Sequence, residues 1–200
     1  FPLGPDQTQY RCLTTEGISL AEFDGQEILK ITPETLTLLA NEAIRESHAE
    51  LKRWMPWANP LPAPEDTEEA YRRMAAQWIT RESLPLIIFR KSDGLFVGGT
   101  GLMCRDWDVP YFEIGYWMRT SLTGQGYMTE AALAQTRFAF DVLGAQRVEI
   151  RMNALNTRSI AVAERAGYKY EGRLRNYMRD SEGELADMLY YALTASDWNG

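Results

Sequence analysis

The chain has 200 residues, of which 45% are hydrophobic and 24% are charged, a composition that suits one globular domain with a sizeable core. Its formal net charge of −7 argues against nucleic acid as the main ligand and suits a cationic partner, although solubility alone also explains it. One histidine and two cysteines without metal-ligand spacing give no reason to expect a metal site or a disulfide framework. We therefore expect a reducing, cytoplasmic location, and the lack of a long apolar span gives no reason to expect a membrane partner.

The apolar pattern predicts helices alternating with strands, without an internal repeat. The expected elements are an extended segment over 17–32, a helix over 33–50, a proline-rich loop over 54–64, a helix over 65–81, strands over 84–90, 95–104 and 111–118, a helix over 127–143, a strand over 147–152, a helix over 156–166 and a hairpin over 169–179 and 184–195. Antiparallel strands followed by strand–helix–strand units predict an α+β domain with a mixed, mostly antiparallel central sheet flanked by helices. We expect residues 1–16 to be an N-terminal extension and residues 17–200 to form this single domain.

One joint between a strand and a helix stands out. The strand that ends near Met118 leads through a loop containing Gly124 and Gly126 directly into the helix over 127–143. The first N–H groups of a helix have no intrahelical partner, and the macrodipole adds partial positive charge there, so a phosphate can bind at such a loop. Two glycines that only make the turn are an equally good explanation. A dinucleotide fingerprint is disfavoured because Thr129 stands where its last glycine is required, and no P-loop lysine follows.

Several short segments carry a family resemblance. They are, in chain order, LKRWMPW at 51–57, EIGYWM at 113–118, GQGYMTEA at 124–131, NTRS at 156–159, AGY at 166–168 and YEGR at 170–173. With these segments the chain resembles the GNAT superfamily of acetyl-CoA-dependent N-acetyltransferases, and within it the RimJ/RimL type that acetylates protein N-termini. The resemblance covers residues 17–195 and implies the GNAT fold, with acetyl-CoA as cosubstrate and no metal.

The resemblance also implies where acetyl-CoA binds. The residues implied to hold the diphosphate are Gly124, Gln125, Gly126, Tyr127, Met128 and Thr129. The main chain of Trp117 and Met118 is implied to pair with the pantetheine arm, and Asn156 to hydrogen-bond it. The glycine loop of the family often carries basic residues at the positions of Ser121 and Thr123, so diphosphate binding here is expected to depend on backbone N–H groups and the helix dipole.

Acetyl transfer to an amine needs a neutral amine, a donor for the developing oxyanion and a proton for the departing thiolate. Many relatives supply that proton from a tyrosine, but the matching residue here is Ala163. Ser159 lies one helical turn after Asn156 and, in line with the resemblance, is expected to stabilise the thiolate or relay a proton; a local capping role is the alternative. Glu171 is the candidate base, acting through a water, and its alternatives are an exposed strand carboxylate or a group that only binds the ammonium.

The acceptor can be weighed by the energy of deprotonation. Making an α-amine neutral at pH 7 costs about 1 kcal/mol, whereas a lysine-like amine costs about 4–5 kcal/mol. One modest base therefore favours the N-terminal α-amine of a protein.

A small-molecule amine acetyltransferase, acting on a polyamine or an aminoglycoside, and a non-catalytic acetyl-CoA-binding domain are the alternatives. An open mouth between the loop over 54–64 and the hairpin tip near 176–179 would suit a peptide, and a closed acidic pocket a polycation. A homodimer is a candidate assembly.

Overall fold

The structure, a computed structural model, describes residues 12–14, 18–22 and 33–199. Its helices are α1 (Pro33–Trp54), α2 (Pro64–Thr80), α3 (Tyr127–Asp141) and α4 (Thr157–Arg165), with short 3-10 turns η2 (Pro56–Ala58) and η3 (Thr120–Leu122). Its strands are β1 (Cys12–Thr14), β2 (Ile18–Glu22), β3 (Ser83–Arg90), β4 (Phe96–Asp106), β5 (Tyr111–Met118), β6 (Arg147–Asn153), β7 (Lys169–Arg179) and β8 (Leu185–Thr194). Within these residues, no helix is both long enough and apolar enough to cross a membrane.

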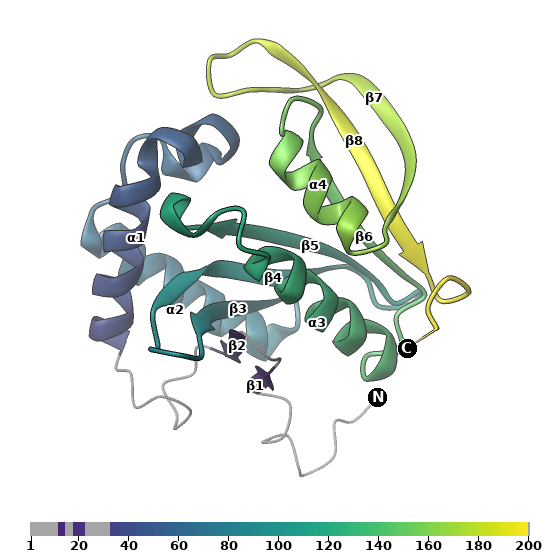
Figure 1. Ribbon diagram of the computed structural model, residues 1–200, viewed down its shortest axis with the longest axis horizontal. Coiled ribbons are helices and arrows are strands. Elements are labelled where there is room, and N and C mark those ends of the chain that lie inside the picture. The colour runs from purple at the N-terminus through teal and green to yellow at the C-terminus, as the bar shows by residue number, and fades with distance from the viewer. Residues whose placement is uncertain (1–11, 15–17, 23–32, 200) are drawn as a thin grey trace.

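The described strands form one sheet in the order β1-β2-β3-β4-β5-β6-β8-β7 (Figure 1). Every neighbouring pair is antiparallel except β5 and β6, which are parallel and are connected through α3. The predicted α+β class and mixed sheet are therefore confirmed. A parallel pair needs a crossover connection, and the helix that supplies it here is the one that begins at the glycine loop.

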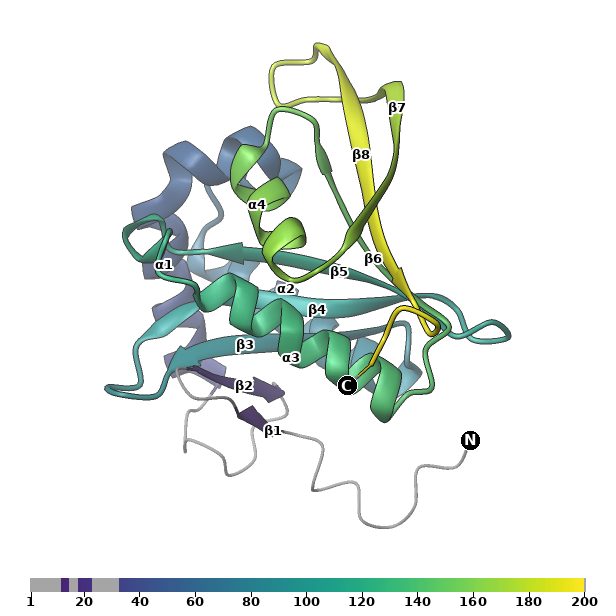
Figure 2. The same cartoon turned by 45° about the vertical axis from the view of Figure 1, so that its right-hand side comes forward.

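Helices cover both faces of the central strands. Helices α1 and α2 lie on one face, and α3 and α4 lie on the other (Figures 1 and 2). Strand β3 shows why its sequence is almost continuously apolar: Leu86 and Ile88 pack toward α3, while Ile87 and Phe89 pack toward α1 and α2. A strand buried on both faces loses the alternation of apolar and polar residues that a half-buried strand shows.

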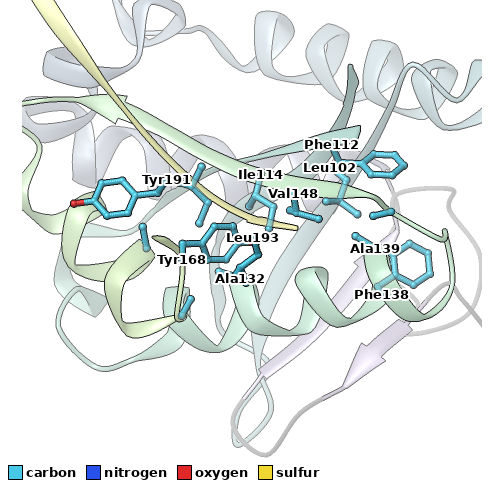
Figure 3. Packing of buried hydrophobic residues seen from close by; sticks show 14 of the residues in the cluster. Leu102, Phe112, Ile114, Ala132, Phe138, Ala139, Val148, Tyr168, Tyr191 and Leu193 are labelled. Carbon is cyan, nitrogen blue, oxygen red and sulfur yellow. The ribbon is translucent and has the colours of Figure 1, made fainter. Parts of the chain in front are cut away.

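The largest core cluster lies between the sheet and α3 (Figure 3). Phe112 and Ile114 of β5 and Val148 of β6 are at most 1% exposed, and Phe138 of α3 packs against the same cluster. Because side chains alternate along a strand and Phe112 and Ile114 of β5 face α3, the odd-numbered side chains of β5 point to the opposite face of the sheet. That division decides which side chains are free to build a site.

Most boundaries agree with the expected elements, with small shifts at the ends. Helix α1 continues to Trp54 rather than ending near Glu50, and β4 extends to Asp106 rather than Cys104. The expected extended segment contributes β2, and residues 23–32 lie outside the described residues. Within the expected N-terminal extension, β1 pairs with β2 at the edge of the sheet.

Candidate active site

The site is built where β5 and β6 separate. The two strands pair only from Tyr111 and Arg147 to Glu113 and Glu149, and beyond that point each continues beside a different neighbour, β4 or β8. Figure 2 shows β5 and β6 side by side at one end and diverging toward the other. Parallel strands that diverge leave backbone N–H and C=O groups without a ladder partner, and these groups are available to a ligand with amides of its own.

A cavity of about 940 Å³ opens beside this fork. Its walls come from the diverging parts of β5 and β6, the first turn of α4, α2, the segment from Arg53 to Pro62, and the tip of the β7–β8 hairpin. The ring centroid of Trp117 on β5 is 5.8 Å from that of Trp57 in the segment after α1. The proline-rich segment therefore packs against the end of β5 that lies beyond the β5–β6 pairing. The volume is sufficient for an extended ligand and a second substrate end to meet.

The sequence-predicted site residues fall into three places. Trp117, Asn156 and Ser159 line the cavity. Met118 and the glycine-loop residues 124–129 lie outside its lining, after the end of β5 and at the start of α3. Glu171 also lies outside it, on the edge strand β7.

At the glycine loop, Gly124 and Gly126 both have positive φ angles, 78° and 88°. A Cβ at either position would meet no atom within 4 Å, so the backbone conformation, not crowding within the protein, explains the glycines. Gly126 is the N-cap of α3, and no side chain caps the helix there. The first N–H groups of α3 therefore face an exposed loop, as an anion site requires.

The first turn of α4 is fixed from two sides. The Asn156 Oδ1 atom accepts a hydrogen bond of 3.2 Å from the Ser159 backbone N–H, which caps the helix. Tyr116 of β5 donates its hydroxyl to the Ser159 carbonyl oxygen at 3.4 Å, and burial raises the pKa of Tyr116 to about 12. Among the described residues no side-chain or backbone group hydrogen-bonds the Ser159 hydroxyl, which leaves it available to a ligand in the cavity. The side chain of Ala163 is fully buried in the core.

Glu171 is engaged in an ion pair. Its carboxylate accepts two hydrogen bonds from Arg147, at 2.9 and 2.5 Å. These bonds are the main reason that the pKa of Glu171 is lowered. This geometry favours one of the alternatives for Glu171, an exposed strand carboxylate, over a base that meets an amine in the cavity.

The cavity instead contains a carboxylate that the sequence reasoning did not single out. Glu113 of β5 lines the cavity, is only 9% exposed, and accepts hydrogen bonds from Arg105 at 2.5 Å and from Arg151. The signal was present in the sequence, because a glutamate in the otherwise apolar segment YFEIGYWM needs either a partner or a function.

Comparisons with known proteins agree with this geometry. Residues 28–169 match the family model described as an acetyltransferase (GNAT) domain. The fold is similar to that of RimL, a ribosomal L7/L12 alpha-N-protein acetyltransferase in complex with coenzyme A, with a TM-score of 0.80 and 19% identity over 94% of this chain and 99% of that one. YdaF of Bacillus subtilis, named provisionally as a ribosomal N-acetyltransferase, is 36% identical over 88 residues, which cover 44% of this chain and 48% of YdaF.

A second kind of match is short. A stretch of 47 residues is 57% identical to the aerobic class I fumarate hydratase of Salmonella typhimurium, and covers 24% of this chain and 8% of that enzyme. The chain thus spans less than a tenth of the fumarate hydratase and about half of YdaF. The family model, in contrast, covers more than half of the chain and confirms the resemblance in its sequence. The chain therefore belongs to the acetyltransferase (GNAT) domain family.

Proposed function

We propose that the chain is an acetyl-CoA-dependent N-acetyltransferase whose acceptor is the N-terminal α-amine of a protein. The observation that carries the acceptor class is the charge balance of the cavity. Its lining contains four carboxylates and four arginines, Asp66, Glu82, Glu113 and Asp180 with Arg53, Arg73, Arg105 and Arg151. A polycation needs clustered acids, whereas a balanced groove between aromatic and methionine side chains suits the end of a peptide chain.

Three of the four acidic residues in this lining, Asp66, Glu113 and Asp180, already accept hydrogen bonds within the protein. The Asp66 side chain accepts a hydrogen bond from the Ala63 N–H at the start of α2, and Asp180 accepts hydrogen bonds from backbone N–H groups in the hairpin turn. Glu113 is paired with two arginines. One oxygen of Asp66 and one of Asp180 are thus already hydrogen-bonded, and two arginines offset the charge of Glu113, which makes the lining a weaker site for several ammonium groups and disfavours a polyamine or an aminoglycoside.

We assign roles by position in the cavity. Asn156 and Ser159 lie at the fork, where the backbone of Trp117 would pair with the pantetheine arm and the Ser159 hydroxyl would donate to the departing sulfur. The neutral amine nitrogen attacks the thioester carbonyl carbon, the carbon–sulfur bond breaks, the sulfur leaves as the thiolate, and the proton that the nitrogen loses passes through water to the general base. Glu113 is the carboxylate best placed to bind the acceptor ammonium, and Glu171 remains the residue predicted from sequence for the proton transfer.

The deciding experiment measures coenzyme A release from acetyl-CoA with a thiol reagent. Acceptors are peptides that begin with Ser or Ala, their N-blocked versions with an internal lysine, spermidine and an aminoglycoside. We expect turnover with free peptide N-termini only. Turnover with a small amine alone would overturn the acceptor class, and acetyl-CoA binding without any turnover would favour the non-catalytic alternative.

Variants then separate the roles. We expect Ser159→Ala to lower turnover by about 10²-fold or more, as the removal of a group that acts in the transition state does. We expect Glu113→Gln to weaken binding of the acceptor and so to lower turnover at limiting acceptor about tenfold. Glu171→Gln tests the sequence prediction directly. If Glu171→Gln lowers turnover and Glu113→Gln does not, the base lies on β7 and our reading of the cavity is wrong.

The same proposal includes a cytoplasmic location, since a protein N-terminus is available there during synthesis. The homodimer remains a prediction, which sedimentation of the purified chain would check.

A further inference from the structure

Helix α1 is hydrogen-bonded to the segment that leads into the glycine loop. The Thr120 N–H donates to the Ser47 Oγ atom at 2.9 Å. The Ser121 N–H and hydroxyl donate to the Glu46 carboxylate at 3.3 and 2.6 Å. Figure 1 shows the turn that follows β5 lying beside α1. These partners are more than 70 residues apart in the sequence, so the contact is a product of the fold.

A buried arginine supports this junction. Arg119 is 4% exposed, and its Nε atom donates to the Phe96 carbonyl oxygen of β4 at 2.9 Å. Its Nη1 atom donates to Glu46 at 2.5 Å and to Glu42 at 3.2 Å. Glu46 thus accepts from Arg119 with one oxygen and from Ser121 with the other. Burial alone would raise the pKa of Glu46, but the hydrogen bonds from Ser121 and Arg119 lower it below 4.5.

The hydrogen bonds continue from this junction into the loop. Thr123 Oγ1 donates to the Thr120 carbonyl oxygen at 2.8 Å, and Gln125 Nε2 donates to the Ser121 carbonyl oxygen at 3.2 Å. Residues 121–129 contain no lysine or arginine. A diphosphate at this loop would therefore be bound by backbone N–H groups, and such a site works only when those groups are already held in position.

We propose that Glu46 of α1 is a positioning residue for the cofactor: with Arg119, Ser47 and Ser121, it fixes the glycine loop in the conformation that binds the diphosphate of coenzyme A. The inference rests on the proposed function, because it assumes that the chain binds coenzyme A. It assigns to α1 the task that basic loop side chains would otherwise perform by charge.

The test compares two ligands of the full chain. Coenzyme A carries the diphosphate and pantetheine lacks it, so a residue that positions the loop affects only the first. Binding of each is measured by calorimetry for the wild type, Glu46→Gln and Ser121→Ala. Glu68→Gln is the control, because Glu68 also pairs with an arginine, Arg72, but on the exposed surface of α2.

We expect Glu46→Gln to weaken coenzyme A binding about tenfold, as expected for one lost hydrogen bond to a charged group, and to leave pantetheine binding unchanged. Ser121→Ala should also weaken coenzyme A binding and leave pantetheine binding unchanged. Glu68→Gln should change the affinity for neither ligand. Hydrogen exchange at the amides of residues 120–126 should become faster in Glu46→Gln and in Ser121→Ala.

Equal weakening of both ligands, or wild-type coenzyme A affinity in a folded Glu46→Gln protein, would overturn the inference. Ser121→Ala keeps the Arg119 ion pairs and decides the matter if Glu46→Gln does not fold. Absence of coenzyme A binding by the wild-type chain would overturn the proposed function itself. The two failures are therefore distinguishable.

Discussion

Glu113 and Glu149 are partners in the last residue pair that joins β5 to β6, and both are buried, at 9% and 1% exposed. The Arg151 guanidinium lies between them: it contacts Glu113 through Nη2, and its Nε atom is 3.3 Å from Glu149. Arg105 pairs with Glu113 from β4, and Arg147 with Glu149 from the start of β6. Two adjacent carboxylates would repel each other without these cations, so the arginines hold the strands together at the point where the cavity opens.

Removal of the central cation should therefore be costly. We expect Arg151→Met to lower the free energy of unfolding by about 3 kcal/mol, because each of two adjacent buried carboxylates then keeps only one arginine, Arg105 or Arg147. Arg72→Gln, which breaks an exposed ion pair on α2, should cost no more than about 1 kcal/mol. Urea unfolding of both variants measures the difference. A similar, small loss in both would mean that the cluster does not stabilise the fork.

The Glu171–Arg147 pair gives a pH-dependent prediction with a defined sign. The pKa of Glu171 is lowered from its ordinary value of 4.5, mainly by the hydrogen bonds from Arg147. A lowered pKa means that the stabilisation is present above about pH 4.5 and is lost as the pH falls through the lower, folded-state value. Since the Glu171 side chain is 40% exposed, Glu171→Gln should cost no more than about 1 kcal/mol at pH 7.

Chemical unfolding of the wild type and Glu171→Gln between pH 7 and pH 3 checks this sign. The difference in unfolding free energy should shrink toward the acid end. A difference that grows as the pH falls would show that the carboxylate is destabilised, not stabilised, in the folded protein.

Local sequence signals predicted the strand and loop that define the site. The bounds of β5 agree with the expected strand over 111–118, and α3 begins at Tyr127, directly after the two loop glycines. Apolar alternation and glycine placement act within a few residues, so they can be read from the chain without knowledge of its fold. The same locality explains why Asn156 and Ser159, three residues apart at a helix start, were expected together.

The partners of charged residues could not be predicted in this way. Glu171 meets Arg147 only because β8 separates β6 from β7, an order that no local pattern encodes. Glu113 meets Arg151 across the fork, and Arg119 meets Glu46 over a separation of 73 residues. Side chains that are far apart in sequence acquire their roles from the topology, which is why the cavity carboxylate and the α1 junction emerge only from the structure.

The close approach of β4 to β5 beside the site depends on a glycine. A Cβ at Gly98 would lie 2.2 Å from the Trp117 carbonyl oxygen and 2.7 Å from the Met118 Cα atom. Both are backbone atoms that cannot rotate away, so Gly98→Ala should push β5 outward and cost about 3 kcal/mol. Gly172→Ala in β7 is the matched control, because its Cβ would meet no atom within 4 Å.

Thermal unfolding of the two alanine variants tests this packing. Gly98→Ala should lower Tm clearly, and Gly172→Ala should change the unfolding free energy by no more than about 0.5 kcal/mol. Equal stability of the two variants would mean that β4 and β5 separate without cost, in conflict with the pairing of Gly98 with Met118.

The glycine at the start of α3 combines a backbone requirement with a proposed ligand contact. Gly126 has φ of 88° and Gly144, just beyond the other end of α3, has φ of 67°; a Cβ at either would meet open space. Gly126→Ala and Gly144→Ala should therefore each cost about 1–2 kcal/mol of stability, the strain of a left-handed alanine. Only Gly126→Ala should also weaken coenzyme A binding, because its methyl group would stand where the diphosphate approaches the helix N-terminus.

Calorimetric titration with coenzyme A, at a temperature where both variants are folded, separates the two effects. The Gly144→Ala protein should bind as the wild type does, since its substitution lies beyond the far end of the helix. Loss of binding in both variants would assign the effect to general destabilisation, and retention in both would place the diphosphate away from the Gly126 N–H. A loss confined to Gly126→Ala would tie the left-handed N-cap directly to cofactor recognition, because strain of the same size at Gly144 leaves the affinity intact.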